Sequence, residues 1–212
     1  CYLAPPEREA LKPILEADGL VDVIIPRGSQ GLIDFVRANS SVPVIETGAG
    51  ICHTYVDEAA NLDWARAIIT NAKSRRVSVC NALDCILLHC TRVSALPRIL
   101  QELGETHRCE VFADERAYAE LDGNYPAELL HKANEESFGT EFLSMKLSVK
   151  TVDDISEAIA HVERFGSRHS ESIVTDNEAN KNRYLKEVDA AVVYANASTA
   201  FTDGGQFELG AE

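Results

Sequence analysis

The sequence has no apolar stretch near the roughly 20 residues that a membrane-spanning helix needs, and no signal-peptide pattern in its first residues. It also lacks an excess of positive charge, because 20 Lys and Arg residues face 34 Asp and Glu residues, a formal net charge of −14. A nucleic-acid-binding face needs basic residues that neutralise phosphates. We therefore expect neither a nucleic-acid partner nor a membrane partner.

The six cysteines lack the small secreted scaffold that disulfide frameworks stabilise, since the chain has 212 residues and can bury a core of its own. We expect reduced thiols and a cytoplasmic location. Cys80, Cys85, His89 and Cys90 lie close together in the sequence, but they lack the paired two-residue gaps of structural zinc sites. We therefore expect no metal.

Both ends of the sequence suggest a piece of a longer protein. The chain begins with Cys1 rather than Met, and its last stretch, residues 206–212, shows neither a helix cap nor a polar tail. We expect a fragment that is truncated at its C-terminal end.

Short apolar, often β-branched runs alternate with amphipathic segments along the chain. This alternation predicts an α/β fold with a parallel sheet and right-handed crossovers. The predicted strands are residues 21–25, 42–45, 51–56, 84–89, 110–113, 142–149, 172–175 and 190–194. The predicted helices are residues 7–17, 32–38, 57–73, 96–103, 114–121, 152–165 and 177–188.

Two turns follow predicted strands near the start of the chain. The turn at residues 26–31 contains Gly28 and Gly31 and precedes a helix, as in half of a nucleotide-binding unit. Two glycines alone are weak evidence for such a unit. Glu46 ends the next strand, and open α/β sheets place chemistry at the carboxyl ends of strands. A surface acid is the alternative reading for Glu46.

Cys80 lies between a predicted helix and a predicted strand, close to Arg75 and Arg76. Two guanidinium groups would favour the thiolate, the form of cysteine that attacks carbonyl carbon. The alternative is that Cys80 is a small hydrophobic residue of the core.

Six stretches, taken in order, resemble the aldehyde dehydrogenase superfamily and specifically its γ-glutamyl phosphate reductase branch. Glu46 precedes Cys80 by 34 residues, as the glutamate of the superfamily precedes its nucleophile. The matching stretches run from about residue 20 to the end of the chain: residues 25–32, 42–57, 71–73 with 79–82, 136–139, 169–176 and 193–199.

The resemblance implies an aldehyde dehydrogenase-like fold in which residues 1–47 form the C-terminal part of a Rossmann-like NADP-binding domain. Residues 48–212 would then form a truncated catalytic domain. The implied activity is the NADPH-dependent reduction of L-glutamyl 5-phosphate to L-glutamate 5-semialdehyde and phosphate, a step of proline biosynthesis. We expect the fragment by itself to be inactive.

The resemblance also implies roles for individual residues. Cys80 would form a thioester with the substrate, and Glu46 would position the nicotinamide or transfer a proton. The residues implied to contact NADP(H) are Arg27, Gly28, Ser29, Glu136 and Phe138. The residues implied to contact the substrate are Asn81, His169 and Ser170.

Partners and alternatives follow from the same resemblance. Glutamate 5-kinase is a possible pathway partner, and a homo-oligomer is possible. An oxidative aldehyde dehydrogenase that hydrolyses its thioester is one alternative function. A non-catalytic interaction module on the same fold is the other.

Overall fold

The computed structural model describes residues 11–28, 30–45, 49–203 and 208. The chain divides into two compact units, residues 1–49 and 50–212, and each is described by itself. No helix in the described ranges is both long enough and apolar enough to cross a membrane.

Among its described residues the first unit contains two α-helices, α1 Lys12–Leu15 and α2 Gln30–Asn39. Leu15, Ile33, Val36 and Val42 are buried in it. The two strands predicted here are adjacent and parallel, but over the described residues 21–25 and 42–45 they pair only through the bridge between Ile24 and Val44. The prediction of two full strands is therefore wrong. Ile25 and Ile45 are 56% and 58% exposed, so little burial favours a longer pairing.

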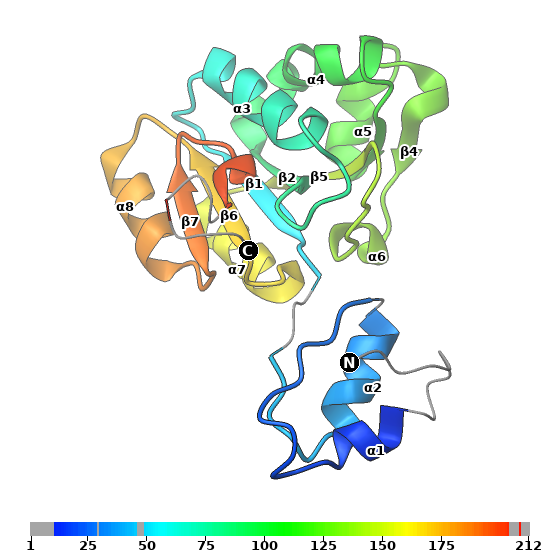
Figure 1. Cartoon of the computed structure of the whole chain (residues 1–212). Helices are drawn as coiled ribbons and strands as arrows, with labels where there is room; N and C mark the ends of the chain where they lie inside the picture. Colours follow the sequence, from blue (N-terminus) through cyan, green and yellow to red (C-terminus); the bar gives the residue numbers. More distant parts are fainter. Residues whose placement is uncertain (1–10, 29, 46–48, 204–207, 209–212) are drawn as a thin grey trace. The chain divides into compact units, whose positions relative to one another are not determined.

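The second unit is a parallel sheet between two layers of helices (Figure 1). Within the described residues the sheet has seven strands in the order β4-β3-β5-β2-β1-β6-β7, and every neighbouring pair is parallel. The strands are β1 Cys52–Val56, β2 Leu83–His89, β3 Glu110–Ala113, β4 Leu130–Lys132, β5 Lys146–Val152, β6 Ser170–Val174 and β7 Val192–Ala195. The predicted α/β class with a parallel sheet is confirmed.

Each face of this sheet packs against its own set of helices. Helices α3 Leu62–Ser74, α4 Leu96–Glu105 and α5 Glu115–Leu121 bury their apolar faces on one side. Helices α7 Ile155–Phe165 and α8 Glu178–Glu187 cover the other side, beside the short helix α6 Glu135–Phe138. The central strand β2 is buried along its whole length, as expected of a parallel strand covered on both faces. The described part of this unit also contains the 3₁₀ helices η2 Cys90–Ala95, η3 Ala127–Leu129 and η4 Thr199–Phe201.

The helix predicted to begin at residue 57 begins instead at Leu62, after its cap Asn61. Asp57 is buried, and its carboxylate accepts hydrogen bonds from Tyr55, Thr175 and Asn180. Because this carboxylate links β1 to the segment after β6, Asp57 does not belong to the helix.

The strand predicted at residues 142–149 is shifted, since β5 covers Lys146–Val152. The backbone N–H of Phe142 donates to the buried carboxylate of Asp84 at 3.1 Å, and Leu143 has a φ of 47°. These features give residues 142 and 143 a loop conformation. The helix predicted from residue 152 consequently starts at Ile155, capped by Asp154.

Lys73 and Asp84 form a buried ion pair between α3 and β2, with 3.5 Å between Nζ and Oδ1. Burial raises the pKa of Asp84 to about 6, although Lys73 and the Phe142 amide oppose the shift. Burial likewise lowers the pKa of Lys73, with Asp84 opposing. Each charge is therefore kept in the core by its partner.

The Asp84→Asn substitution removes one member of this pair and leaves an ammonium group buried without a counter-charge. We expect the free energy of unfolding to fall by about 3–5 kcal/mol, measured by urea denaturation of the full-length protein. The matched control is Asp63→Asn, which breaks the exposed ion pair with Arg98 and should cost less than about 1 kcal/mol. Equal losses in the two variants would contradict a stabilising role for the buried pair.

Candidate active site

Cys80 lies in the turn that joins α3 to β2, where the Ala82 N–H donates to the Val79 carbonyl at 3.0 Å. Its side chain is half-buried, and it lines a cavity of about 360 Å³. Because β1, β2 and β6 are parallel, their amino ends share one edge of the sheet, and Cys80 precedes β2 at that edge. The residues that line the cavity are Arg75, Arg76, Val79, Cys80, Asn81, Ala200, Thr202 and Asp203.

Gly50 and Cys52 hold the backbone of the Cys80 turn. A methyl group on Gly50 would lie 1.8 Å from the Cys80 carbonyl oxygen, so only glycine allows this approach. The Cys52 thiol donates to the same oxygen, with 3.2 Å between Sγ and O. Burial raises the pKa of Cys52 well above its usual value, which keeps this thiol protonated as a donor. The turn is thus fixed by the residues that lead into β1.

Asn81 and Arg75 connect the same turn to the segment after β7. The side-chain amide of Asn81 donates to the Thr202 carbonyl at 2.7 Å, and the backbone carbonyl of Asn81 accepts from the Thr199 hydroxyl at 2.9 Å. Arg75 donates to the Ala200 carbonyl at 2.5 Å. In this structure the Asn81 side chain therefore holds residues 199–202 beside Cys80, and its predicted contact with substrate stays a prediction.

His169 and Ser170 lie at the amino end of β6, beside the Cys80 turn. Nδ1 of His169 lies 2.7 Å from Oγ of Ser170, and Ser170 donates to the Thr202 hydroxyl at 2.8 Å. Thr202 in turn donates to the Tyr194 hydroxyl at 3.1 Å. Nδ1 of His169 is also 4.0 Å from the Cys52 sulfur. The structure thus brings four of the predicted residues, Cys80, Asn81, His169 and Ser170, to one edge of the sheet.

Glu136 and Phe138 lie on α6, away from the lining of the Cys80 cavity as far as the described residues define it. Glu136 is exposed, whereas the Phe138 ring packs edge-to-face on His161 and Phe165. The loop after α6 returns to the Cys80 turn, because the Glu141 carboxylate accepts from the Gly50 N–H at 2.8 Å. A chain of contacts therefore connects α6 to the cysteine through Gly50.

Arg27 and Gly28 belong to the first unit, where both are exposed immediately before α2. Gly28 has a φ of 153°, and a methyl group there would meet the Leu32 side chain at 2.8 Å, so the turn requires glycine. Ser29 and Glu46 lie outside the described residues, and their predicted roles remain predictions.

Sequence reasoning missed Gly50, Cys52, Glu141 and Thr202, which support the candidate site. Of these four residues, only Gly50 could have been recognised from the sequence, because the glycines at positions 48 and 50 indicate a close backbone approach. The other three reach Cys80 or its neighbours through contacts across at least 28 residues of sequence, which local patterns do not record.

The fold defines the class of the protein. An acetylating aldehyde dehydrogenase from Geobacillus thermoglucosidasius superimposes with a TM-score of 0.69 at 19% identity, covering 95% of this chain and 51% of that one. The second unit therefore has an aldehyde dehydrogenase-like fold, as predicted. No model of a protein family matches the chain.

Sequence similarity is more specific. The chain is 58% identical over 211 residues to the γ-glutamyl phosphate reductase of Pelodictyon phaeoclathratiforme, covering 100% of the chain and 50% of the relative. The enzyme of the same name from Parabacteroides distasonis is 55% identical over 212 residues, covering 100% and 51%. The crystal structure of γ-glutamyl phosphate reductase from Thermotoga maritima superimposes with a TM-score of 0.90 at 41% identity, covering 97% of this chain and 48% of that one.

These comparisons confirm the resemblance over the whole chain, which is homologous to γ-glutamyl phosphate reductases. The chain spans about half the length of the curated relatives that it matches.

The exposure of Cys80 predicts faster alkylation than at the buried cysteines. Cys52 and Cys109 are fully buried, and burial raises the pKa of Cys109 to about 12. We expect iodoacetamide to modify Cys80 at least about tenfold faster than either, because the thiolate is the reactive form. Peptide mass spectrometry of the full-length protein measures the rates. Cys90, half-buried and outside the cavity lining, is the control for exposure alone. A Cys80 no faster than Cys52 and Cys109 would support a non-catalytic module.

Proposed function

We propose that this chain forms part of a γ-glutamyl phosphate reductase and supplies its nucleophile, Cys80. The observation that carries the proposal is the half-buried thiol in a cavity that two arginines share, on a chain 55–58% identical to curated enzymes of that name. The substrate is L-glutamyl 5-phosphate, and the product is L-glutamate 5-semialdehyde, an intermediate of proline biosynthesis.

The charges around the cavity support this substrate. Arg75 and Arg76 are exposed residues of the lining, and guanidinium groups bind phosphate through paired hydrogen bonds. We place the phosphate of the substrate beside them. Asp203 supplies a carboxylate to the same lining, and its charge is complementary to the α-ammonium group of the glutamyl moiety.

The chemistry assigned to Cys80 is nucleophilic catalysis. Its thiolate attacks the γ-carbonyl carbon, the carbon–oxygen bond to phosphate breaks, and phosphate leaves with the bonding electrons. The acyl group then remains on Cys80 as a thioester. NADPH, when bound, supplies the hydride that reduces this thioester. Collapse of the resulting thiohemiacetal releases the semialdehyde and returns the thiolate to Cys80.

The cofactor residues proposed from the resemblance are Arg27, Gly28 and Ser29 in the first unit and Glu136 and Phe138 in the second. The described ones fit such a role. Gly28 precedes the N-terminus of α2, which leaves backbone N–H groups for an anion. Glu136 is exposed and lines a cavity of about 740 Å³, so its carboxylate can accept hydrogen bonds from ribose hydroxyls. Phe138 offers an apolar surface anchored by the core.

The domain assignment, the role of Glu46, the cellular location and the partners are also proposals. We assign residues 1–47 to the cofactor domain and residues 48–212 to the catalytic domain, and Glu46 to positioning of the nicotinamide or to proton transfer. A cytoplasmic location, a homo-oligomer and an association with glutamate 5-kinase remain predictions.

The test is an assay of the full-length protein with glutamate semialdehyde, phosphate and NADP⁺, beside its Cys80→Ser variant. We expect the variant to lose at least about a thousandfold in kcat, because removing a nucleophile abolishes the covalent route. Cys90→Ser, a change at a half-buried cysteine outside the cavity lining, should retain activity.

Two outcomes would contradict the proposal. Retained activity in Cys80→Ser would place the nucleophile elsewhere. Oxidation that proceeds equally well without phosphate would favour an oxidative aldehyde dehydrogenase, in which water rather than phosphate cleaves the thioester.

A further inference from the structure

Three buried residues of neighbouring strands form a row across the sheet, on the face that α7 and α8 cover. Glu171 of β6 is the register partner of His53 of β1, and His53 is the register partner of Cys85 of β2. All three are fully buried. A carboxylate, an imidazole and a thiol are thus held side by side in a core that is otherwise mainly apolar.

The two ring nitrogens of His53 have different environments. Nδ1 lies 3.1 Å from Oε2 of Glu171, which also accepts the backbone N–H of His53 at 2.8 Å. Nε2 is buried and has no hydrogen-bond partner. In the neutral ring, with Nδ1–H donating to the carboxylate, Nε2 carries a lone pair that faces the interior. Burial lowers the pKa of His53, but Glu171 and Cys85 outweigh it and raise this pKa to about 10, so an ion that binds Nε2 must displace a proton. A buried polar atom without a partner is destabilising, so an occupant at Nε2 would be stabilising.

His161 of α7 completes the cluster from above the sheet. Its Nε2 is 3.9 Å from the Cys85 sulfur, and its ring stands edge-to-face to the His53 ring with 5.6 Å between centroids. Packing against Phe138 and Phe165 fixes the ring. One atom from each of His53, Cys85 and His161 lies within 4.8 Å of the other two.

These separations come within the spacing that one small metal ion needs once the side chains close in by up to about 1.5 Å. Tetrahedral Zn²⁺, with bonds of about 2.3 Å to sulfur and about 2.0–2.1 Å to nitrogen, separates sulfur from nitrogen by about 3.6 Å and two nitrogens by about 3.3 Å. The 3.9 Å between Cys85 and His161 needs only a few tenths of an ångström of closure. Two imidazoles and a thiolate are ligands that Zn²⁺ prefers, whereas Ca²⁺ and Mg²⁺ require oxygen.

We propose that His53 Nε2, Cys85 Sγ and His161 Nε2 bind one Zn²⁺ ion, which joins α7 to strands β1 and β2. Glu171 is the positioning residue, because it fixes the tautomer and the ring orientation of His53, as carboxylates do behind zinc-bound histidines. The thiol proton of Cys85 and the proton on His53 Nε2 are released to solvent on binding. The proposed site does not include the residues that lie near Cys85 in the sequence, namely Cys80, His89 and Cys90. Nδ1 of His89 lies 2.8 Å from the Thr91 hydroxyl instead.

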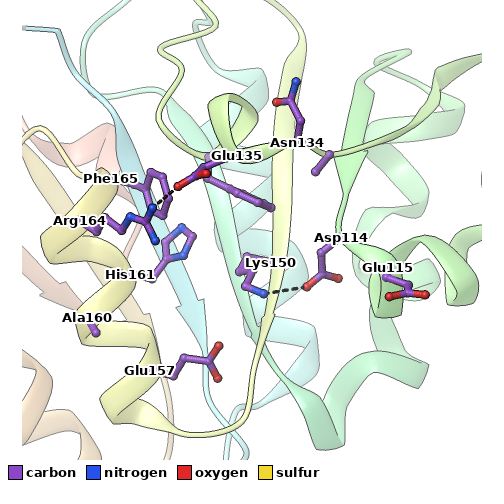
Figure 2. A pocket seen from close by; sticks show the side chains of 12 residues that line it. Asp114, Glu115, Asn134, Glu135, Lys150, Glu157, Ala160, His161, Arg164 and Phe165 are labelled. Atoms are coloured by element: carbon purple, nitrogen blue, oxygen red, sulfur yellow. Dashed lines mark hydrogen bonds and ion pairs between the residues drawn. The ribbon is translucent and has the colours of Figure 1, made fainter.

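His161 also lines a cavity from which an ion could approach the cluster. Figure 2 shows His161 and Phe165 at the α7 wall of a cavity of about 660 Å³. Its charged lining contains two cations, Lys150 paired with Asp114 and Arg164 paired with Glu135. Glu115 and Glu157 add two further carboxylates, so the lining carries more negative than positive charge and favours cation entry.

The experiment uses the full-length protein with Cys80→Ser, which removes the accessible nucleophile as an adventitious ligand. After chelation and dialysis, the protein is titrated with Co²⁺ and then with Zn²⁺. We expect one Co²⁺ per chain with a thiolate-to-cobalt charge-transfer band, displaced by Zn²⁺. Zinc should also raise the thermal unfolding midpoint, because it binds only the folded chain.

Variants of the cluster locate the ion. Cys85→Ser should abolish the charge-transfer band, and His161→Gln should weaken Zn²⁺ binding at least about a hundredfold. Glu171→Gln should weaken it about 10–100-fold, as loss of an outer-shell partner does. Cys109→Ser, a change at another fully buried cysteine, is the control and should leave binding unchanged.

Three results would overturn the proposal. The first is the absence of a charge-transfer band in the full-length Cys80→Ser protein. This result would exclude the cobalt site even if one of the cluster variants failed to fold. The second is a band that survives Cys85→Ser. The third is equal loss of binding in Cys109→Ser. None of these results tests Cys80 as the nucleophile, because the titrated protein carries Cys80→Ser and lacks that thiol.

Discussion

The in-register alignment of β6, β1 and β2 is the constraint on which the rest of the second unit depends. Parallel pairing brings the starts of these strands, near Ser170, Cys52 and Leu83, to one edge of the sheet. The same pairing, with a register shift between β1 and β2 after Cys52, sets Glu171, His53 and Cys85 in a row further along the strands. A slip of one residue would move the side chains of the slipped strand to the other face. Register therefore determines both the cysteine site and the buried cluster.

Close packing at the sheet edge converts this alignment into a defined position for Cys80. Gly50 touches the carbonyl of the cysteine turn, and Cys52 donates to it. Asn81 then connects the turn to residues 199–202, of which Ala200 and Thr202 line the cavity. Contacts from the start of β1 and from the segment after β7 thus hold the Cys80 turn in place. For the nucleophile proposed at Cys80, such positioning is a large part of catalytic power. The arrangement leaves the thiol itself half-buried at the cavity.

The sequence predicted the regular core well and the site less completely. Strand β2 and helix α4 were recognised to within two residues, because a continuous apolar run and a strong amphipathic period are local signals. The strand predicted at residues 142–149 failed because Asp84, far away in sequence, binds the Phe142 N–H. The three-residue strand β4 was missed because it is too short to show a period.

Cys80 carried a local signal in its neighbouring arginines, but His169 and Ser170 were named only through the family resemblance. Their proximity to the Cys80 turn depends on β6 pairing with β1, which no local pattern contains. The same holds for Thr202 and for His161, which comes from a helix packed over the strands. Contacts across long stretches of sequence are the part that only the structure supplies.

The central claim is that the substrate becomes covalently attached to Cys80. The most direct measurement is rapid acid quench of a single turnover of the full-length protein with glutamate semialdehyde and NADP⁺, without phosphate, followed by peptide mass spectrometry. The account predicts a glutamyl group on the Cys80 peptide that disappears when phosphate is added before the quench. Reduction of NADP⁺ with an unmodified Cys80, or with the acyl group on another residue, would contradict it.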